Sequence, residues 1–404
     1  MRIVVVPSSF PQVSETFIVR HVAGLNAEVF CPEINTGLLQ KLIPKPHVYG
    51  MIREYKEPSD PMSWSILERV SRRLQLVPKR LRWLANSVAN PAENFRWGRQ
   101  DENSWHKYLD DRKPDVVLAE FAPNAFNVLP QCMRLGIPVV AHFHGYDASI
   151  LMGFRSYRRA LKSLFKQAAA VACVSKYMHA VLVKAGCPVA KLHVIPCGAP
   201  VSEFVPTPRV GEQPCRFISV SRLAPGKGPF VMLKAFYRTW QCLPSSTLTI
   251  VGDGCLRDEL VAYCKANGLG TAVEFTGPVA VDEVRKRMAE ACVFLQASLT
   301  TADGGVEGWG VSLAEALATG LPAIVTRSGG MTDLVMDGVN GFLFEEGDAE
   351  TMAQKMILLA ENPALRVRMG MAGRAHVEKV GSTEKCLARL KSVLLTAQQE
   401  RLSY

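Results

Sequence analysis

The 404-residue sequence has no apolar run of the length that a membrane-spanning helix requires. Such a helix needs roughly 18 or more consecutive apolar residues. The first residues, 1–7, are too few for a secretory signal peptide and offer no cleavage site, so we expect none. The composition, 48% hydrophobic and 21% charged, is typical of a globular protein, and the length favours two or three domains.

The sequence also lacks paired cysteines and metal-binding motifs. Its eleven cysteines are odd in number and scattered, with no Cys-x-x-Cys and no Cys/His spacing of a zinc site. We therefore expect free, mostly buried thiols, as in a reducing cytoplasm, and no metal site.

Acidic residues are scarce in the first half of the chain. Residues 1–200 contain 26 Lys and Arg against 15 Asp and Glu, a charge of +11, whereas residues 201–404 contain 21 and 22, a charge of −1. The overall charge of +10 therefore belongs to one half. This asymmetry favours two domains with different partners, and an anionic surface is the candidate partner of the basic one.

Two basic stretches, residues 64–84 and 155–166, carry much of this charge. The first places apolar residues on one helical arc and arginines elsewhere, and the second has five cations and no acidic residue. Basic amphipathic helices suit the surface of an anionic membrane leaflet. The alternative is that the apolar arcs pack on the protein's own sheet and leave the cations in solvent. No nucleic-acid-binding module is recognisable, so we expect no nucleic-acid partner.

Short β-branched runs alternate with helical stretches, which predicts an α/β fold with doubly wound parallel sheets. We predict a Rossmann-like domain over residues 1–200, a second over 201–382, and a last helix within 383–404 whose return to the first domain the sequence leaves open. The predicted strands cover residues 1–7, 115–119, 138–142, 168–174 and 192–196, then 216–220, 247–251, 273–276, 291–295 and 322–326. The predicted helices of the second domain cover residues 230–240, 256–266, 281–289, 311–319 and 349–360. Ligands bind beyond the carboxyl ends of such strands, so we expect the chemistry in those loops, facing a cleft between the domains.

The strongest functional signal is a glycine-rich segment before an apolar helix, at residues 303–322. A helix N-terminus presents unpaired amides and a positive dipole end to an anion. Glu307 stands in the loop and Glu315 in the helix, about 12 Å apart along the axis if the interval is helical. Carboxylates at that separation suit hydroxyls on different parts of an extended ligand. The alternative is a glycine-rich loop with two solvated glutamates.

Two cations, Arg222 and Lys227, follow the strand predicted at 216–220, in a turn with two glycines. They suit a diphosphate, since Arg can hold two oxygens at once and Lys supplies a point charge. The spacing is not that of a Walker A loop. The alternative is two surface cations in a turn. A Gly-Asp-Gly turn at 252–254 follows the next strand and is a weak signal by itself.

Polar residues also follow two strands of the first domain. Segment 142–147 places two histidines at a strand end, where a ligand role and a structural role are both open. Ser14, Glu15 and Thr16 stand at the start of a helix after the first strand, where hydroxyls and amides can bind an acceptor or a phosphate.

Together these residues resemble the retaining glycosyltransferases of family 4, which have the GT-B fold of two Rossmann-like domains. Glu-x7-Glu at Glu307 and Glu315, Ser-Arg-Leu…Lys-Gly at 221–228 and Gly-Asp-Gly at 252–254 match in order and spacing. Segment 337–342 resembles a further family motif. The Ser-Phe-Pro-x-x-Ser-Glu-Thr-Phe start and His-Gly-Tyr-Asp are similar to a subgroup that builds exopolysaccharide and O-antigen repeat units.

The resemblance implies a role for each matching position. Arg222 and Lys227 would bind the donor diphosphate and stabilise the leaving nucleotide. Glu307 would contact hydroxyls of the transferred sugar, and Glu315 the ribose hydroxyls. His144, with His142 as the alternative, would touch the sugar near the reacting carbon. We count Glu307, His144, Arg222 and Lys227 as catalytic. Further donor contacts would come from Gly252, Gly308, Trp309, Gly310, Val311, Ser312 and Leu313. We assign acceptor binding to Ser14, Glu15, Thr16, Tyr146 and Asp147.

The implied function is retaining transfer of a hexose-type sugar from a UDP- or GDP-linked donor to a lipid-linked or glycan acceptor in bacterial polysaccharide or glycolipid synthesis. The expected lipid-linked acceptor is a polyprenyl diphosphate or a glycolipid. No Asp-x-Asp motif is present, so no metal or other cofactor is expected and the cations would replace Mg²⁺. We expect a cytoplasmic enzyme, peripheral on the inner face of the membrane. The alternatives are a sugar-nucleotide epimerase of the same fold and a catalytically idle sugar- or lipid-binding module.

Overall fold

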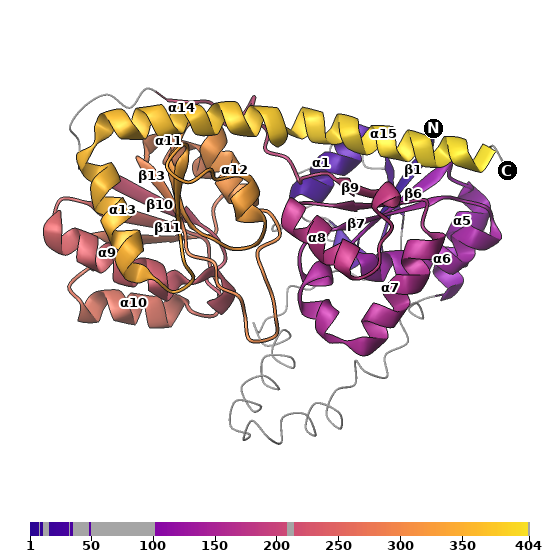
Figure 1. Cartoon of the computed structure of the whole chain (residues 1–404), viewed down its shortest axis with the longest axis horizontal. Coiled ribbons are helices and arrows are strands. Elements are labelled where there is room, and N and C mark those ends of the chain that lie inside the picture. Colours follow the sequence, from indigo (N-terminus) through magenta and orange to yellow (C-terminus); the bar gives the residue numbers. More distant parts are fainter. Residues whose placement is uncertain are drawn as a thin grey trace, which may run out of the picture. The chain divides into compact units, whose positions relative to one another are not determined.

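The structure is a computed structural model that describes residues 1–7, 9–10, 16–31, 33–34, 48–49, 102–207 and 214–402. It divides into two compact units (Figure 1). The first unit comprises residues 1–174, 178–195 and 387–404, and the second comprises residues 175–177 and 196–386.

The first unit is built on a seven-stranded parallel sheet with the strand order β5-β3-β1-β6-β7-β8-β9. The strands are β1 (Ile3–Val6), β3 (Glu28–Phe30), β5 (Val48–Tyr49), β6 (Val116–Glu120), β7 (Val139–Phe143), β8 (Ala170–Cys173) and β9 (Leu192–Val194). A separate parallel pair joins β2 (Ser9–Phe10) to β4 (Glu33–Ile34). The helices are α1 (Thr16–Leu25), α5 (Glu102–Arg112), α6 (Ala122–Arg134), α7 (Arg155–Gln167) and α8 (Lys176–Lys184).

The second unit is built on a six-stranded parallel sheet with the order β12-β11-β10-β13-β14-β15. The strands are β10 (Arg216–Val220), β11 (Thr247–Val251), β12 (Val273–Gly277), β13 (Val293–Gln296), β14 (Ala323–Thr326) and β15 (Gly341–Phe344). The helices are α9 (Pro229–Cys242), α10 (Arg257–Ala266), α11 (Val281–Glu290), α12 (Val311–Ala318), α13 (Ala349–Glu361) and α14 (Pro363–Val380).

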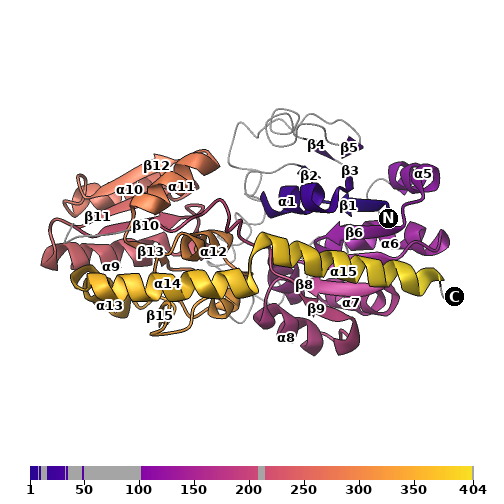
Figure 2. The same ribbon diagram turned by 90° about the horizontal axis from the view of Figure 1, so that it is seen from above.

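Each sheet is enclosed by helices, which confirms the predicted doubly wound α/β class (Figures 1 and 2). Strands β6 and β7 are buried along their whole length, as expected of a parallel sheet covered on both faces. Large side chains fill the core of each unit: Phe143, Tyr157 and Phe165 in the first, and Phe217, Phe236 and Phe294 in the second, are all fully buried.

Helix α14 was not among the predicted helices. Its sequence contains Gly370 and Gly373, and glycine in a helix interior costs about 1 kcal/mol relative to alanine, which weakens the helical signal. The tertiary structure requires the first of them, because a Cβ atom at Gly370 would lie 2.0 Å from the carbonyl oxygen of Gly320. The short strands β3 and β5 were also not predicted.

The last helix, α15 (Thr383–Leu402), begins in the second unit, and its part from Leu387 onward belongs to the first. Within the first unit, the Leu387 side chain lies against Gly24 of α1. Leu390, Leu394 and Ala397 are buried, at the spacing of one helical face. No helix among the described residues is both long enough and apolar enough to span a membrane.

Candidate active site

The chain order of the second unit places two loops at the centre of its sheet. From β10 the chain moves outward through β11 and β12, then returns to β13 on the other side of β10. Neighbouring strands whose following connections diverge in this way form a topological switch point, where open α/β sheets bind ligands. The loops after β10 and β13 carry Lys227 and Glu307, so the fold brings two of the predicted residues to one place.

Lys227 and Glu307 form an ion pair at this switch point. The ammonium of Lys227 donates to Oε2 of Glu307, which also accepts hydrogen bonds from Nε2 of Gln296 (3.0 Å) and Oγ of Ser298 (3.3 Å). The two side chains are mostly buried, with 25% and 13% of their surfaces exposed. Burial alone would raise the pKa of Glu307, but the charge and hydrogen bond of Lys227, the Ser298 hydroxyl and nearby Arg222 lower it below the usual value. Glu307 is therefore ionised at neutral pH.

Helix α12 begins at Val311, four residues after Glu307, with Gly310 as its N-cap in the left-handed region. The first hydrogen bond within the helix runs from the amide of Ala314 to the carbonyl of Gly310. The amides of Val311, Ser312 and Leu313 therefore have no acceptor within the helix. No acidic side chain stands in the first turn of α12. The helix end is thus a site of positive potential for an anionic ligand.

The other predicted donor residues lie in the same unit. Arg222 is exposed in the loop after β10, and Glu315 is buried on α12, one turn beyond its start. Gly252 follows β11 and its amide donates to the carbonyl of Gly277 (3.0 Å). The ring of Trp309, which was predicted to contact the donor, is buried in this unit. It is 3% exposed and lies against Gly381, so only the backbone of Trp309 remains for a ligand contact.

The first unit has an equivalent switch point between β1 and β6. The chain runs from β1 out to β3 and β5 and returns at β6, with β7 beyond it. Glu120 is the last residue of β6 and is the cross-strand partner of His142 on β7. His144 follows β7 directly, and its ring lies 4.5 Å from Phe17 and 4.8 Å from Phe121, between ring centroids. The predicted His144 therefore lies where this sheet places its ligand-binding loops.

Three histidine rings surround Glu120. Nδ1 of His21, on α1, and Nε2 of His144 each donate to a Glu120 oxygen at 2.6 Å, while Nδ1 of His142 lies 3.4 Å from Oε2. Burial would raise the pKa of Glu120, but the neighbouring His21 and His144 outweigh it and hold the pKa well below its usual range. Burial, followed by the influence of His142, lowers the pKa of His144 to about 3. The cluster therefore holds a carboxylate beside a neutral His144.

Asp147 and Tyr146 belong to the loop that follows His144. The Asp147 carboxylate is fully buried and accepts hydrogen bonds from the amides of His144 (3.0 Å), Gly145 (2.9 Å) and Ala122 (3.1 Å). Its oxygens are thus engaged by backbone amides that shape the loop, and its contact with an acceptor stays a prediction. Tyr146 is 39% exposed and stacks on Phe121. It is the more accessible of the two for an acceptor.

The predicted acceptor residues near the first strand are only partly described. Thr16 is the first residue of α1 and is partly buried, whereas Ser14 and Glu15 lie outside the described residues. Residues 64–84, the first basic stretch, also lie outside them.

The second basic stretch forms α7, and its two faces are clearly separated. Tyr157, Leu161, Leu164 and Phe165 are buried in the core of the first unit. The cations are exposed: Arg155, Arg158, Arg159, Lys162 and Lys166. The apolar arc therefore packs on the protein itself, as the alternative interpretation of the sequence held, and only the cationic face of α7 is exposed.

One cluster in the described part of the chain has the residue types of a metal site. His21, Glu120 and His142 are buried, and their ligand atoms lie within 4.8 Å of one another. His144 is hydrogen-bonded to Glu120 of this cluster. We predicted no metal site from the sequence.

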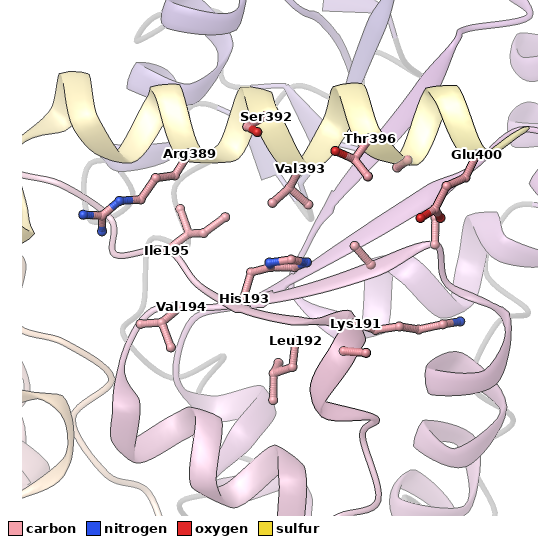
Figure 3. A pocket seen from close by; sticks show the side chains of 14 residues that line it. Lys191, Leu192, His193, Val194, Ile195, Arg389, Ser392, Val393, Thr396 and Glu400 are labelled. Atoms are coloured by element: carbon pink, nitrogen blue, oxygen red, sulfur yellow. The ribbon is translucent and has the colours of Figure 1, made fainter. Parts of the chain in front are cut away.

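A groove of about 690 Å³ lies elsewhere in the first unit, between β8, β9 and α15. His193 faces the helix across it, and Arg389, Ser392, Thr396 and Glu400 line the opposite side (Figure 3). None of the predicted site residues that the structure describes lines this groove.

Comparison with known proteins agrees with this geometry. The family model described as "Glycosyltransferase Family 4" matches residues 23–203, and "Glycosyl transferases group 1" matches residues 203–376. The amylovoran biosynthesis glycosyltransferase AmsK of Erwinia amylovora is 32% identical over 274 residues, which is 66% of this chain and 67% of AmsK. This chain belongs to the family 4 glycosyltransferases.

Two further similarities concern proteins whose descriptions name a sugar nucleotide. A GDP-mannose-dependent alpha-(1-6)-phosphatidylinositol monomannoside mannosyltransferase of Mycolicibacterium smegmatis is 30% identical over 247 residues, 58% of this chain and 64% of that protein. The crystal structure of HepE from Anabaena in complex with UDP-glucose has a TM-score of 0.70 at 20% identity, covering 98% of this chain and 100% of HepE. The likeness to HepE over almost the whole chain confirms the GT-B fold of this glycosyltransferase.

Several residues of the site escaped the sequence analysis of this glycosyltransferase. Glu120 and His21 belong to no recognisable motif. A charged residue at the end of a buried strand, such as Glu120, is nevertheless a signal that can be read from a sequence. Gln296 ends the buried strand β13, Ser298 follows it, and both side chains donate to Glu307. Each of these residues gains its place from a strand order that the sequence does not display.

Proposed function

We propose that this glycosyltransferase moves a hexose-type sugar from a UDP- or GDP-linked donor to a lipid-linked or glycan acceptor, in polysaccharide or glycolipid synthesis. The observation that carries the proposal is the Lys227–Glu307 pair at the switch point beside the N-terminus of α12. A cation and free helix amides suit a diphosphate, and a carboxylate a few ångströms away suits sugar hydroxyls. AmsK, the mannosyltransferase and HepE carry names or ligands of this chemistry.

The reaction that these residues would support proceeds with retention and without a metal. The bond between the anomeric carbon and the diphosphate breaks, a bond to the acceptor oxygen forms, and the acceptor proton passes to the leaving diphosphate. Lys227, Arg222 and the α12 amides stabilise the charge that develops on the diphosphate. Glu307 holds hydroxyls of the transferred sugar, Glu315 the ribose hydroxyls, and neutral His144 the sugar near the reacting carbon.

In the described structure Lys227 is paired with Glu307, so donor binding must change this ion pair. The diphosphate must share or replace the carboxylate as the partner of Lys227. Glu307 then keeps its hydrogen bonds to Gln296 and Ser298 and turns its remaining acceptor capacity to the sugar.

Donor binding is tested by thermal unfolding with UDP-glucose, GDP-mannose, UDP and GDP. A ligand that binds the folded state raises the melting temperature, and the stabilisation grows with the logarithm of its concentration over its Kd. We expect one nucleotide series to stabilise the protein, and Lys227→Ala to abolish that shift. Lys234→Ala, an exposed lysine on α9, is the matched control and should keep it.

Transfer is tested with the donor so identified and a panel of polyprenyl-diphosphate and glycan acceptors. Glu307→Gln should lower kcat by roughly a hundredfold or more, as expected for a lost transition-state contact. NMR of the product should show the donor's anomeric configuration, and EDTA should leave the rate unchanged. Full transfer by both Lys227→Ala and Glu307→Gln would refute these assignments. An isomerised donor without any acceptor would instead favour the epimerase.

The lipid acceptor points to a membrane surface, and we propose that the exposed cations of α7 contribute to binding it. Their attraction to anionic headgroups is worth about 1 kcal/mol per cation near the surface. The apolar face of α7 is not available for insertion, because it lies in the core. The contact is therefore electrostatic.

A further inference from the structure

Glu120 is a buried charge that none of the roles above employs. Its side chain is 0% exposed at the carboxyl end of β6, at the switch point of the first unit. An isolated carboxylate in such a place is costly unless it is paired and hydrogen-bonded. Here two histidine N–H groups supply the partners, His21 on one oxygen and His144 on the other, both at 2.6 Å.

The hydrogen bonds fix which ring nitrogen of each histidine carries the proton. A carboxylate can only accept, so His144 donates from Nε2 and His21 from Nδ1. Nε2 of His142 donates to the carbonyl oxygen of Ile195 (3.0 Å), and its Nδ1 has no hydrogen-bond partner. In a neutral His144 ring with its proton on Nε2, Nδ1 carries a lone pair and acts as an acceptor.

The neutral state of His144 makes this tautomer matter. Its pKa is lowered to about 3, first by burial and next by His142, so the ring carries no charge near neutral pH. It therefore offers an acceptor to a sugar hydroxyl rather than a proton to a leaving group. A ring with its proton on Nδ1 would present a donor at the same place and lose that interaction.

We propose that Glu120 is a positioning residue for the transfer reaction, holding His144 in the Nε2–H tautomer and in a fixed ring orientation so that Nδ1 accepts a hydrogen bond from the transferred sugar. This inference rests on the proposed function, in which His144 contacts the sugar. Phe17 and Phe121 pack against the His144 ring, which limits its rotation and supports the same orientation.

A metal ion held by His21, Glu120 and His142 is the competing explanation of the cluster. Two ligands of one tetrahedral zinc, each about 2.0–2.1 Å from it, stand about 3.3 Å apart. The 2.6 Å between Nδ1 of His21 and Oε1 of Glu120 is instead the length of a charge-assisted hydrogen bond. The geometry thus favours a proton between these atoms. Elemental analysis of the purified full-length protein decides the matter, and one equivalent of bound zinc would overturn the proposal.

The kinetic test is a double-mutant cycle between Glu120→Gln and His144→Ala. Gln can present an N–H₂ group to Nε2 of His144 and so favours the other tautomer. We expect Glu120→Gln to lower kcat on the order of tenfold or more, with little change in the KM for the donor. Because Glu120 acts through His144, Glu120→Gln should not lower kcat any further in the His144→Ala background. Equal losses in both backgrounds, or undiminished kcat in Glu120→Gln, would show that Glu120 has only a structural role.

A second measurement uses the protein with Glu120 unchanged, so it does not depend on whether a Glu120 variant folds. Long-range ¹⁵N–¹H correlation spectra of the histidine rings report the tautomer directly, and His144→Ala identifies the His144 signals. We expect a neutral ring protonated at Nε2 from pH 6 to pH 8. A ring protonated at Nδ1, or charged in this range, would overturn the proposal. Failure of the proposed function is separate: it appears as the absence of any nucleotide-sugar stabilisation, which depends on the second unit.

Discussion

Glu307 is a mostly buried carboxylate and Glu120 a fully buried one, and different partners keep them ionised. Glu307 faces the ammonium of Lys227, a full charge, together with Gln296 and Ser298. Glu120 faces histidine rings. Removing one partner of such a buried group leaves an uncompensated charge, which costs more than the interaction contributes. Substitutions at these two positions should therefore be conservative in shape.

The pKa of Glu307 predicts how its contribution to stability depends on pH. Because the folded-state pKa lies below the usual 4.5, the pair stabilises the fold above about pH 4.5 and loses that effect as the pH falls through the lower folded pKa. We expect Glu307→Gln to have a smaller free energy of unfolding than the wild type at neutral pH. The difference should shrink below about pH 4. Urea unfolding across this pH range measures it.

The matched control for this prediction is Glu259→Gln, an exposed glutamate on α10. Its unfolding free energy should follow the wild-type pH dependence. A Glu307→Gln profile parallel to the wild type at every pH would contradict the assigned ionisation of Glu307.

The site residues show what the sequence can and cannot supply at this scale. Glu307, Lys227 and His144 follow apolar strands in recognisable motifs, so they were predictable. Glu120 stands 99 residues from His21 and 24 residues from His144. No local pattern joins such distant positions, and their hydrogen bonds exist only because β6, β7 and α1 meet at one sheet edge.

At the scale of elements, the helix starts of the second unit position the chemistry. Gly228 is the N-cap of α9 with φ of 59°, directly after Lys227. A Cβ atom there would lie 1.9 Å from the carbonyl oxygen of Ala297, just beyond β13. The loop that carries Lys227 thus packs against the loop that leads to Glu307, and glycine is what permits the approach.

Gly228→Ala should therefore destabilise the protein by at least about 1 kcal/mol, since alanine is strained at positive φ and meets backbone. It should also weaken nucleotide stabilisation, because Lys227 must shift with its neighbour. Gly270→Ala is the matched control, as nothing lies within 4 Å of the added Cβ atom. Its unfolding free energy should stay within about 1 kcal/mol of the wild type. Equal effects at both positions in urea unfolding would contradict the packing argument.

For the molecule as a whole, the uneven distribution of charge makes a prediction of its own about the binding partner. The first 200 residues carry +11 and the rest −1, and α7 holds five of the cations on its exposed side. The residues that we propose to bind the nucleotide belong to the nearly neutral part. The excess charge is therefore better matched to an anionic surface than to the donor.

We expect vesicles with anionic lipid to capture the protein in flotation experiments, and salt to weaken the capture. The double variant Arg159→Glu and Lys162→Glu should float less than the wild type. Lys234→Glu with Lys265→Glu makes the same change in net charge on the second unit and should float more than the α7 variant. Equal loss in both pairs, or equal capture by neutral vesicles at every salt concentration, would refute a role for α7.

The sequence by itself determined the α/β class, the motifs from which we predict the donor site and the uneven charge, because each depends on local spacing or composition. The tertiary structure decided the rest. It buried the apolar face of α7, packed the ring of Trp309 against Gly381, and joined Lys227 to Glu307. It also gathered Glu120 with its histidines, since strand order places side by side residues that lie far apart in the chain.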